Sequence, residues 1–245
     1  MKSTAPMARL DRLLANMGYG SRREVAGLVR AGRVVLDGVP LKAADQKIAV
    51  TPDLSERMWI NGVLLDPPPG LAFMLHKPLG VTCSHKEAGE LVYDLFPPRW
   101  RARDPALSTV GRLDKETSGL LLITDDGALL HRIISPRSQI SKRYHVTLAR
   151  PLEGGEAEQF AEGGLLLEGD DKPLLPARMQ ALSPTTAWLT ISEGRYHQVR
   201  RMFAAVGNHV ETLHRAQMGD LTLNDLKPGK WRLLTEAEAQ NLLKN

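Results

Sequence analysis

The chain has 245 residues, of which 42% are hydrophobic and 24% are charged, and it carries a net charge of +4. This length is enough for one large or two modest domains with a buried core. The single cysteine excludes an internal disulfide, no apolar run is long enough to span a bilayer, and no His or Cys cluster has zinc-ligand spacing. The N-terminus has no apolar segment of signal-peptide length, so we expect a cytoplasmic protein.

Positive charge is concentrated near the N-terminus. Between Met7 and Val50 there are eight Lys and Arg residues against four acids, so this segment alone accounts for the net charge of the chain. A basic module on a nearly neutral body indicates an anionic partner that the module binds.

The first elements in chain order are two short helices and two hairpins. Leucines at helical spacing predict a helix over 9–17, and Ser21 with Glu24 forms a capping-box pattern that begins a second helix. Asp37-Gly38 and Asn61-Gly62, each between apolar runs, predict two-residue hairpin turns.

The second helix and the segment after the hairpins bear on function and domain organisation. The exposed face of that helix carries three cations, Arg22, Arg23 and Arg30. Such a face is either solvated or a binding surface. The three prolines of 66–70 predict a stiff, extended spacer, and we place a domain boundary there.

The body after the spacer contains more strands than helices. Apolar or alternating runs predict strands or extended segments over 71–75, 81–83, 120–124, 142–148, 176–182, 187–191 and 209–213. Helical spacing predicts helices over 91–96, 128–134, 156–162, 196–206 and 235–243. Because these strands do not alternate regularly with helices, we expect an α+β fold with a mixed, mostly antiparallel sheet.

Residues 111–127 are the most informative stretch of the body. Arg112 and Asp114 lie two apart on a turn that begins with Gly111, and a short apolar run follows. An acid on a turn braced by a buried strand is well placed to act as a nucleophile or a base. The alternative is a tight turn with a solvated ion pair.

Two further clusters are candidates for chemistry. Residues 192–203 place three arginines (195, 200 and 201), His197 and Gln198 around the first turns of a predicted helix, where an anion is favoured. Alternatively, these arginines pair with surface acids. Tyr144 lies on the predicted strand 142–148 and is either a core residue or part of a cleft, and the lone Cys83 is predicted to be a small buried residue.

Taken together, these segments resemble a known family. Residues 112–127, 142–146 and 194–202 resemble, in the same order, three motifs of the pseudouridine synthases, and Lys77-Pro78 with Gly80-Val81 resembles a first, less specific motif. Residues 7–65 resemble an S4 RNA-binding domain, as in the RsuA-type branch of that family. The resemblance implies an S4-like domain over 7–66, a Pro-rich linker over 67–70 and a catalytic domain over 71–243.

The resemblance also implies an activity, which is the isomerisation of uridine to pseudouridine in ribosomal RNA. Residues 193–210 are most similar to enzymes that act on 16S rRNA, so the implied partner is 16S rRNA or a partly assembled small ribosomal subunit. The reaction needs no redox change and no group donor, so no cofactor and no metal are expected. A monomer is the default expectation.

Residue roles follow from the same resemblance. Asp114 would be the catalytic aspartate, Tyr144 would pack against the target uracil, and Arg200 would form a salt bridge with Asp114. Arg112 would help displace the target base and occupy the gap that it leaves. The other residues predicted to bind substrate are Lys77, Arg195, His197, Gln198, Arg22 and Arg23.

Three alternatives stay open at this point. The first is a pseudouridine synthase that acts on 23S rRNA, and the second is a non-catalytic RNA-binding protein of the S4 type. The third is a glycoside hydrolase, which needs two carboxylates flanking one bond. The adjacent pairs Asp125-Asp126 and Asp170-Asp171 fall in apparent turns, and we predict that they are solvated.

Overall fold

The computed structural model describes residues 5–135 and 137–243 and divides into two compact units. Unit 1 comprises the chain up to Leu71 together with Phe96–Ser108 and Thr124–Asp126. Unit 2 comprises Ala72–Leu95, Thr109–Ile123 and the chain from Gly127 onward. The described residues contain no helix that is long and apolar enough to cross a membrane.

Unit 1 begins with the predicted pair of helices and continues into small sheets. Its elements are β1 (Met7–Arg9), α1 (Leu10–Asn16), α2 (Arg22–Arg30), β2 (Val34–Leu36), β3 (Val39–Pro40), β4 (Lys47–Ala49), α3 (Leu54–Arg57), β5 (Met58–Ile60), β6 (Val63–Leu64) and η2 (Pro98–Ala102). The strands form a sheet of order β3-β2-β5-β6 and a separate β1-β4 pair. Both predicted hairpins are present, and Asp37 and Asn61 have the positive φ that this turn requires.

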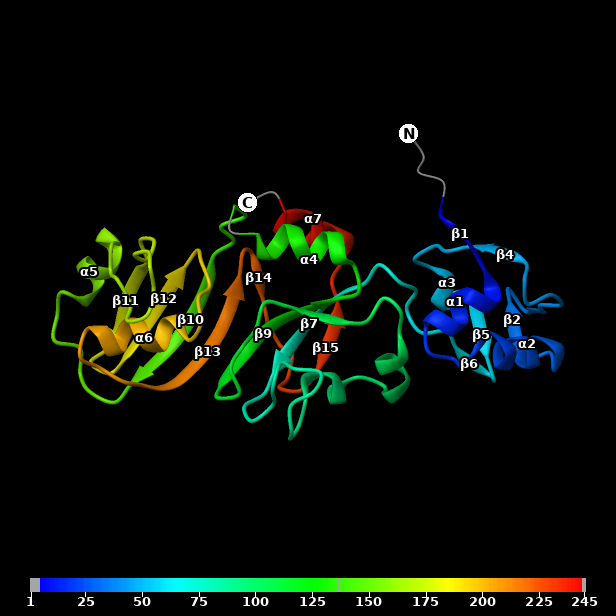
Figure 1. Ribbon diagram of the computed structural model, residues 1–245, viewed down its shortest axis with the longest axis horizontal. Helices are drawn as coiled ribbons and strands as arrows, with labels where there is room; N and C mark the ends of the chain where they lie inside the picture. The colour runs from blue at the N-terminus through cyan, green and yellow to red at the C-terminus, as the bar shows by residue number, and fades with distance from the viewer. Residues whose placement is uncertain (1–4, 136, 244–245) are drawn as a thin grey trace. The chain divides into compact units, whose positions relative to one another are not determined.

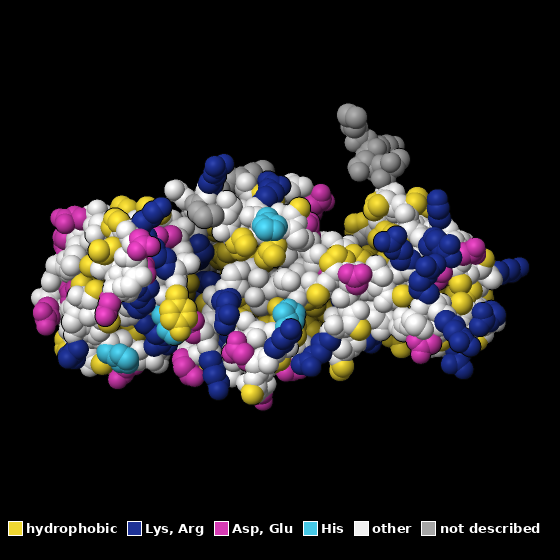
Figure 2. Space-filling view, viewed as in Figure 1, with side chains coloured by type: hydrophobic (Ala, Val, Ile, Leu, Met, Phe, Trp, Pro, Cys, Tyr) yellow, Lys and Arg dark blue, Asp and Glu magenta, His cyan; other side chains and the backbone are white. Residues whose placement is uncertain are grey.

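Helix α2 has the predicted amphipathic character. The Ser21 hydroxyl accepts the backbone N–H of Glu24, and the Glu24 carboxylate accepts the backbone N–H of Ser21, which completes the capping box. Val25 and Val29 are buried in a core built from α1, α2 and the sheet. The opposite face is exposed, and Figure 2 shows Lys and Arg side chains gathered on the visible face of unit 1.

The proline-rich segment is held within unit 1 by two buried side chains. Asp125 accepts the backbone N–H groups of Gly70 and Leu71, at 2.9 and 2.7 Å, and Arg103 donates to the Pro67 carbonyl. The Arg103 and Asp125 side chains are each 1% exposed and form an ion pair at 3.4 Å. The prediction that Asp125 is solvated is therefore wrong, because this carboxylate is needed as an acceptor inside unit 1.

Unit 2 is built around one large sheet with the strand order β11-β12-β10-β13-β9-β7-β15, in which β14 pairs with β13 and β8 with β9 (Figure 1). Its strands are β7 (Ala72–Lys77), β8 (Ser108–Val110), β9 (Thr117–Thr124), β10 (Lys142–Leu148), β11 (Arg178–Ser183), β12 (Thr186–Ile191), β13 (Val210–Met218), β14 (Leu221–Thr222) and β15 (Trp231–Leu233). Its helices are η1 (Val92–Leu95), α4 (Gly127–Ile134), α5 (Glu156–Glu162), α6 (Gln198–Ala205) and α7 (Glu236–Leu242). The predicted α+β class with a mixed, mostly antiparallel sheet is confirmed.

Helices cover the sheet in two groups (Figure 1). Helices α4 and α7 lie over the end that contains β9, β7 and β15, where Leu130 and Leu242 join a core with Leu120 and Leu122 of β9. Helices α5 and α6 lie over the half formed by β10 to β13 and contact each other through an edge-to-face pair of phenylalanines. Two helices thus cover each half of the sheet, and the two halves meet at the central strands β13 and β9.

The parallel pairing of β13 with β9 depends on a glycine. Gly119 lies opposite Arg215, and a Cβ atom at Gly119 would overlap the Arg215 carbonyl oxygen. Gly119 also has a φ of +116°, which L side chains rarely adopt. The strand that follows Asp114 can therefore approach β13 only with glycine at this position.

Candidate active site

Asp114 lies in the loop between β8 and β9, inside unit 2. Its side chain is 35% exposed, and one carboxylate oxygen lies 3.3 Å from Nε2 of His197. The neighbouring Leu113 is buried and anchors the loop, and its backbone N–H bonds to the buried Cys83 thiol. The loop thus presents a carboxylate to solvent from a fixed backbone.

Lys77 fixes this loop from below. Its side chain is completely buried, and Nζ donates to the carbonyls of Asp114 and Thr117 at 3.1 and 2.8 Å, and also to those of Pro78 and Lys115. Burial lowers the pKa of the Lys77 amine. We predicted that Lys77 binds substrate, but the structure corrects this because the amine is enclosed by the loop that it supports.

Helix α6 supplies the other side of the site. His197 is its N-cap residue and has a left-handed φ of 49°, and this conformation precedes the turn that carries Arg200. Arg200 donates to the carbonyls of Val210 and Glu116, at 2.7 and 2.9 Å. The predicted salt bridge between Arg200 and Asp114 is therefore not made in this structure, where His197 pairs with the aspartate. Arg200 instead ties α6 to β13 and to the end of the Asp114 loop.

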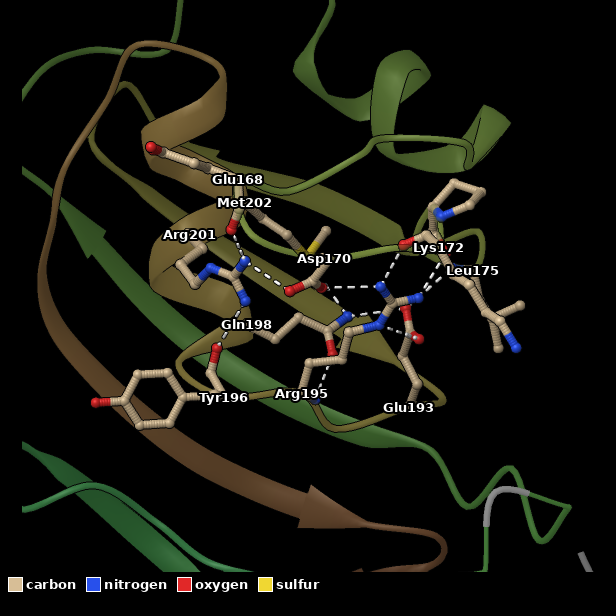
Figure 3. Close-up of polar contacts among 11 residues, drawn as sticks. Glu168, Asp170, Lys172, Leu175, Glu193, Arg195, Tyr196, Gln198, Arg201 and Met202 are labelled. Atoms are coloured by element: carbon tan, nitrogen blue, oxygen red, sulfur yellow. Dashed lines mark hydrogen bonds and ion pairs between the residues drawn. The ribbon is translucent and has the colours of Figure 1, made fainter.

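A second set of polar side chains holds the start of α6 (Figure 3). Asp170 pairs with Arg195 and Arg201, each at 2.8 Å. Arg195 also pairs with Glu193 at 3.1 Å, and the buried Gln198 amide donates to Glu193 and accepts the Arg195 backbone N–H. Arg195 and Gln198 were predicted to bind substrate, but here both are engaged within the protein.

This network also corrects the prediction for the second acid pair. The Asp170 side chain is only 18% exposed, and Arg195, followed by Arg201, lowers the pKa of its carboxyl group. Asp171, next in the chain, is exposed as predicted. The alternative interpretation of the arginine cluster, in which the cations pair with acids, therefore holds for Arg195 and Arg201.

Tyr144 lies on β10 and is 7% exposed. It is directly opposite Arg215 of β13 and Leu189 of β12, so these three side chains share one face of the sheet. Lys142, two residues earlier on β10, lies on the same face and is half-buried. Sequence analysis did not find Arg215, because an isolated arginine in an alternating strand carries no local signal of burial.

Two exposed side chains flank this region. Arg112 is 67% exposed, and its one ion pair in the described structure is a 3.7 Å contact with the exposed Glu87. Tyr196 is 77% exposed and stacks on His197 with ring centroids 3.9 Å apart. Arg112 thus makes one long contact with an exposed acid, whereas the Tyr196 ring packs against its neighbour.

The described residues contain no group of three or more His, Cys, Asp or Glu side chains arranged to hold a metal ion. Around Asp114, the structure places a histidine beside the carboxylate, together with an aromatic ring and several cations. Such a set suits proton transfer or nucleophilic attack by Asp114, with cations to stabilise developing negative charge.

Comparisons with family models give two matches. Residues 72–205 match the model described as RNA pseudouridylate synthase, and residues 8–50 match the model described as S4 domain. The first match includes Asp114, Tyr144 and Arg200, and the second includes Arg22 and Arg23.

Individual relatives are similar over nearly their whole length. The chain is 42% identical to ribosomal small subunit pseudouridine synthase A of Escherichia coli (strain K12), over 96% of this chain and all of that protein. It is 40% identical to the protein of the same name from Vibrio cholerae, over the same shares. Among solved structures, a pseudouridylate synthase crystal structure matches 96% of this chain and 99% of its own, with a TM-score of 0.66 and 38% identity.

Proposed function

Because the chain belongs to the RNA pseudouridylate synthase family and isomerises uridine to pseudouridine, we propose that its substrate is the 16S rRNA of the small ribosomal subunit. Support comes from relatives named for that subunit, which are 40–42% identical over their full length. We further propose that the protein acts as a monomer in the cytoplasm, where ribosomal subunits are assembled.

The isomerisation replaces one bond to the ribose by another. The bond from uracil N1 to C1′ of the ribose breaks, the uracil turns, and a bond from its C5 to C1′ forms. The proton on C5 is lost and N1 gains one, so the overall composition does not change. Asp114 serves this sequence either by attacking C1′ or by assisting proton removal from the sugar.

The choice of 16S rRNA rests on the names of these relatives, whereas the isomerisation itself is supported by the way the structure presents Asp114. This carboxylate is partly exposed, pairs with His197 at 3.3 Å and lies on a loop whose backbone is held by the buried Lys77 amine. A rigidly held reactive group gains rate from orientation, and an exposed one can meet a substrate as large as RNA.

The target uridine must leave its base stack before Asp114 can reach the sugar. Arg112 is exposed and only weakly paired, so its long cationic side chain is available to fill the gap in the RNA. Unit 1 would hold the RNA mainly through Arg23 and Arg30, which are exposed on α2. Arg22 is exposed on the same helix but pairs with Asp11 at 2.8 Å. Contacts of this kind go to phosphates and position the RNA without reading its sequence.

The experiment that tests this proposal uses purified protein with unmodified 16S rRNA or a partly assembled small subunit, and no added cofactor. Pseudouridine is mapped by carbodiimide labelling and primer extension, with Asp114→Ala and Asp114→Asn in parallel. We expect one modified site with the parent protein and none with either variant, which should still bind RNA. Modification of 23S rRNA alone would contradict the substrate assignment, and activity retained in both variants would contradict the role of Asp114.

A further inference from the structure

Two positively charged side chains lie on the same sheet face as Tyr144, and no acid of the described residues forms an ion pair with either. They are Lys142 of β10 and Arg215 of β13, which we call the cation pair. Arg215 lies directly opposite Tyr144 on the neighbouring strand, and Lys142 is two residues from Tyr144 on the same strand. All three side chains therefore lie on one face of the sheet.

Arg215 is the more enclosed member of the cation pair. The residue is 3% exposed, and its Nε donates to the Leu120 carbonyl at 2.7 Å. Its Nη2 is buried and has no hydrogen-bond partner. A buried guanidinium with an unused donor is costly unless something else compensates its charge.

Lys142 is similarly under-used. Of its three N–H donors, one bonds to the Ile140 carbonyl at 2.9 Å. Within the described part of the chain, neither member of the cation pair makes an ion pair with an acid. The charge of Glu193 raises the pKa of Lys142, but this carboxylate already accepts hydrogen bonds from Arg195, from Gln198 and from the backbone N–H of Leu175.

Buried charges that lack partners are characteristic of functional sites, because the missing partner is supplied by the substrate. Two cations on one face require an anion, and the isomerisation generates one: when the N1–C1′ bond breaks, its electron pair stays on the uracil and spreads over N1, O2 and O4. We propose that the cation pair stabilises this detached uracil anion through its carbonyl oxygens. The proposal rests on the isomerisation activity and not on which subunit supplies the RNA.

The same chemistry would suit an RNA phosphate, so the two sources of negative charge must be distinguished. A phosphate contact contributes equally before and during the reaction and therefore changes RNA affinity. A contact with the uracil anion exists only after bond cleavage begins, so it changes the rate at saturating RNA and leaves affinity almost unaltered.

The test variant is Lys142→Met, with Lys142→Arg to restore the charge and Arg143→Met as the matched control. Arg143 is adjacent on β10 but lies on the opposite face, over the Trp188 ring at 4.3 Å. Single-turnover pseudouridine formation is measured at saturating RNA, using whichever ribosomal RNA the parent protein modifies, and the dissociation constant is measured separately. Because Arg215 also anchors the Leu120 carbonyl, its own replacement is a secondary variant.

We expect the rate of Lys142→Met to fall at least tenfold at pH 7, with RNA affinity within twofold, and the rate of Lys142→Arg to stay near that of the parent. Burial, followed by the charge of Arg215, lowers the pKa of Lys142 to about 8, while Glu193 opposes the shift. The charge is present below that pH and lost above it. The parent rate should therefore decline above pH 8, and that of Lys142→Arg should not.

A thermal measurement separates function from structure. Because folding lowers the pKa of Lys142, its charge destabilises the folded protein at pH 7. The Lys142→Met variant should therefore unfold at a higher temperature than the parent at pH 7, although it reacts more slowly. Weaker RNA binding with an unchanged saturated rate would overturn the proposal in favour of a phosphate site. The proposal would also be overturned if Lys142→Met reacted at the parent rate, or if a lower unfolding temperature of the variant accounted for its slower reaction. Inactivity of the parent protein on every ribosomal RNA would instead reject the proposed function.

Discussion

Asp114 depends for its position on a lysine 37 positions earlier in the chain. Among the residues that the structure describes, no acid pairs with the Lys77 amine, which donates to the Pro78 carbonyl and to three carbonyls of the segment 114–117. A single cation shared by these carbonyls fixes the backbone on both sides of the aspartate. The loop is therefore held through its main chain, and the side chain of Asp114, which Lys77 does not contact, pairs with His197.

Replacing Lys77 by Met should release this loop. The carbonyls of Asp114 and Thr117 would lose a buried donor, which costs about 1–3 kcal/mol of unfolding free energy. Catalysis should fall by a further order of magnitude or more because the carboxylate is no longer oriented. Urea unfolding and single-turnover kinetics measure the two effects. Lys115→Met, in the same loop but exposed, is the control, and equal effects of the two variants would contradict the bracing role.

At this scale the sequence predicted residue types better than their contacts. Asp114 contacts His197 and Tyr144 is buried, and their roles in catalysis stay predictions, whereas Lys77 and Arg195 are enclosed by other parts of the protein. A motif specifies residue types and their spacing, but whether a cation faces the substrate or a carbonyl depends on distant segments. Asp170, for example, is 25 positions from the Arg195 that it binds.

Helix α6 is the element on which the site depends most directly. Its N-cap residue, His197, contacts Asp114, and the segment around Asp170 holds Arg195 and Arg201 on either side of that N-cap (Figure 3). A short helix gains little stability from its own hydrogen bonds. Its first turn is therefore positioned by these ion pairs and by Arg200.

Asp170→Asn should loosen the start of α6. We expect a several-fold loss of single-turnover rate and a lower unfolding temperature, because Arg195 and Arg201 lose their shared carboxylate. Since the pKa of Asp170 is lowered, its stabilising contribution is present at neutral pH and is lost as the pH falls through that lowered value. Asp171→Asn, at the adjacent exposed residue, should leave both properties unchanged. A similar loss in the Asp171 variant would contradict this prediction.

Helix α7 offers a pH-dependent test in another element. Glu238 completes the capping box with Thr235 and pairs with Arg232 at 2.6 Å, and the hydrogen bond from Arg232 is the main cause that lowers its pKa to about 2. Its stabilising contribution is therefore complete above pH 4.5 and is lost as the pH falls towards 2. Glu238→Gln should remove this part of the acid dependence in thermal unfolding scans between pH 5 and 2. An identical pH profile in the variant would contradict it.

The local sequence pattern predicts the longer helices and strands but not the shortest strands. The segments 142–148 and 156–162 match β10 and α5 residue for residue, because period and bounding residues agree there. Strands β1, β4 and β15 have three residues each, too few to show any periodicity, and they form only because partner strands far along the chain bind them. Tertiary pairing therefore decides what local pattern leaves undetermined.

For the whole molecule, we propose that unit 1 holds the RNA and that unit 2 carries out the reaction. The exposed cations of α2 should contribute to affinity alone. In a double variant, Arg23→Ala with Arg30→Ala, we expect weaker RNA binding and a salt dependence whose slope falls by about one per charge removed. The rate at saturating RNA should stay unchanged. Arg57→Ala is the control, because Arg57 is already paired with Asp37 and Asp53 in the same unit.

A lower saturated rate in that double variant would contradict the division of labour. The measurement needs filter binding or fluorescence anisotropy at several salt concentrations, together with single-turnover assays at RNA excess. Phosphate contacts do not depend on the base sequence, so the loss of affinity should be the same for an RNA that contains the target sequence and for one that does not.

The one cysteine of the chain gives access to the motion of the Asp114 loop. Cys83 is 5% exposed, and its thiol accepts a hydrogen bond from the backbone N–H of Leu113. Burial raises the pKa of this thiol. A thiol reagent can therefore react only when this loop opens locally. With no other cysteine to compete, the rate of alkylation followed by mass spectrometry reports the opening frequency directly, without any engineered label. Bound RNA should slow that alkylation to the extent that it keeps the loop closed.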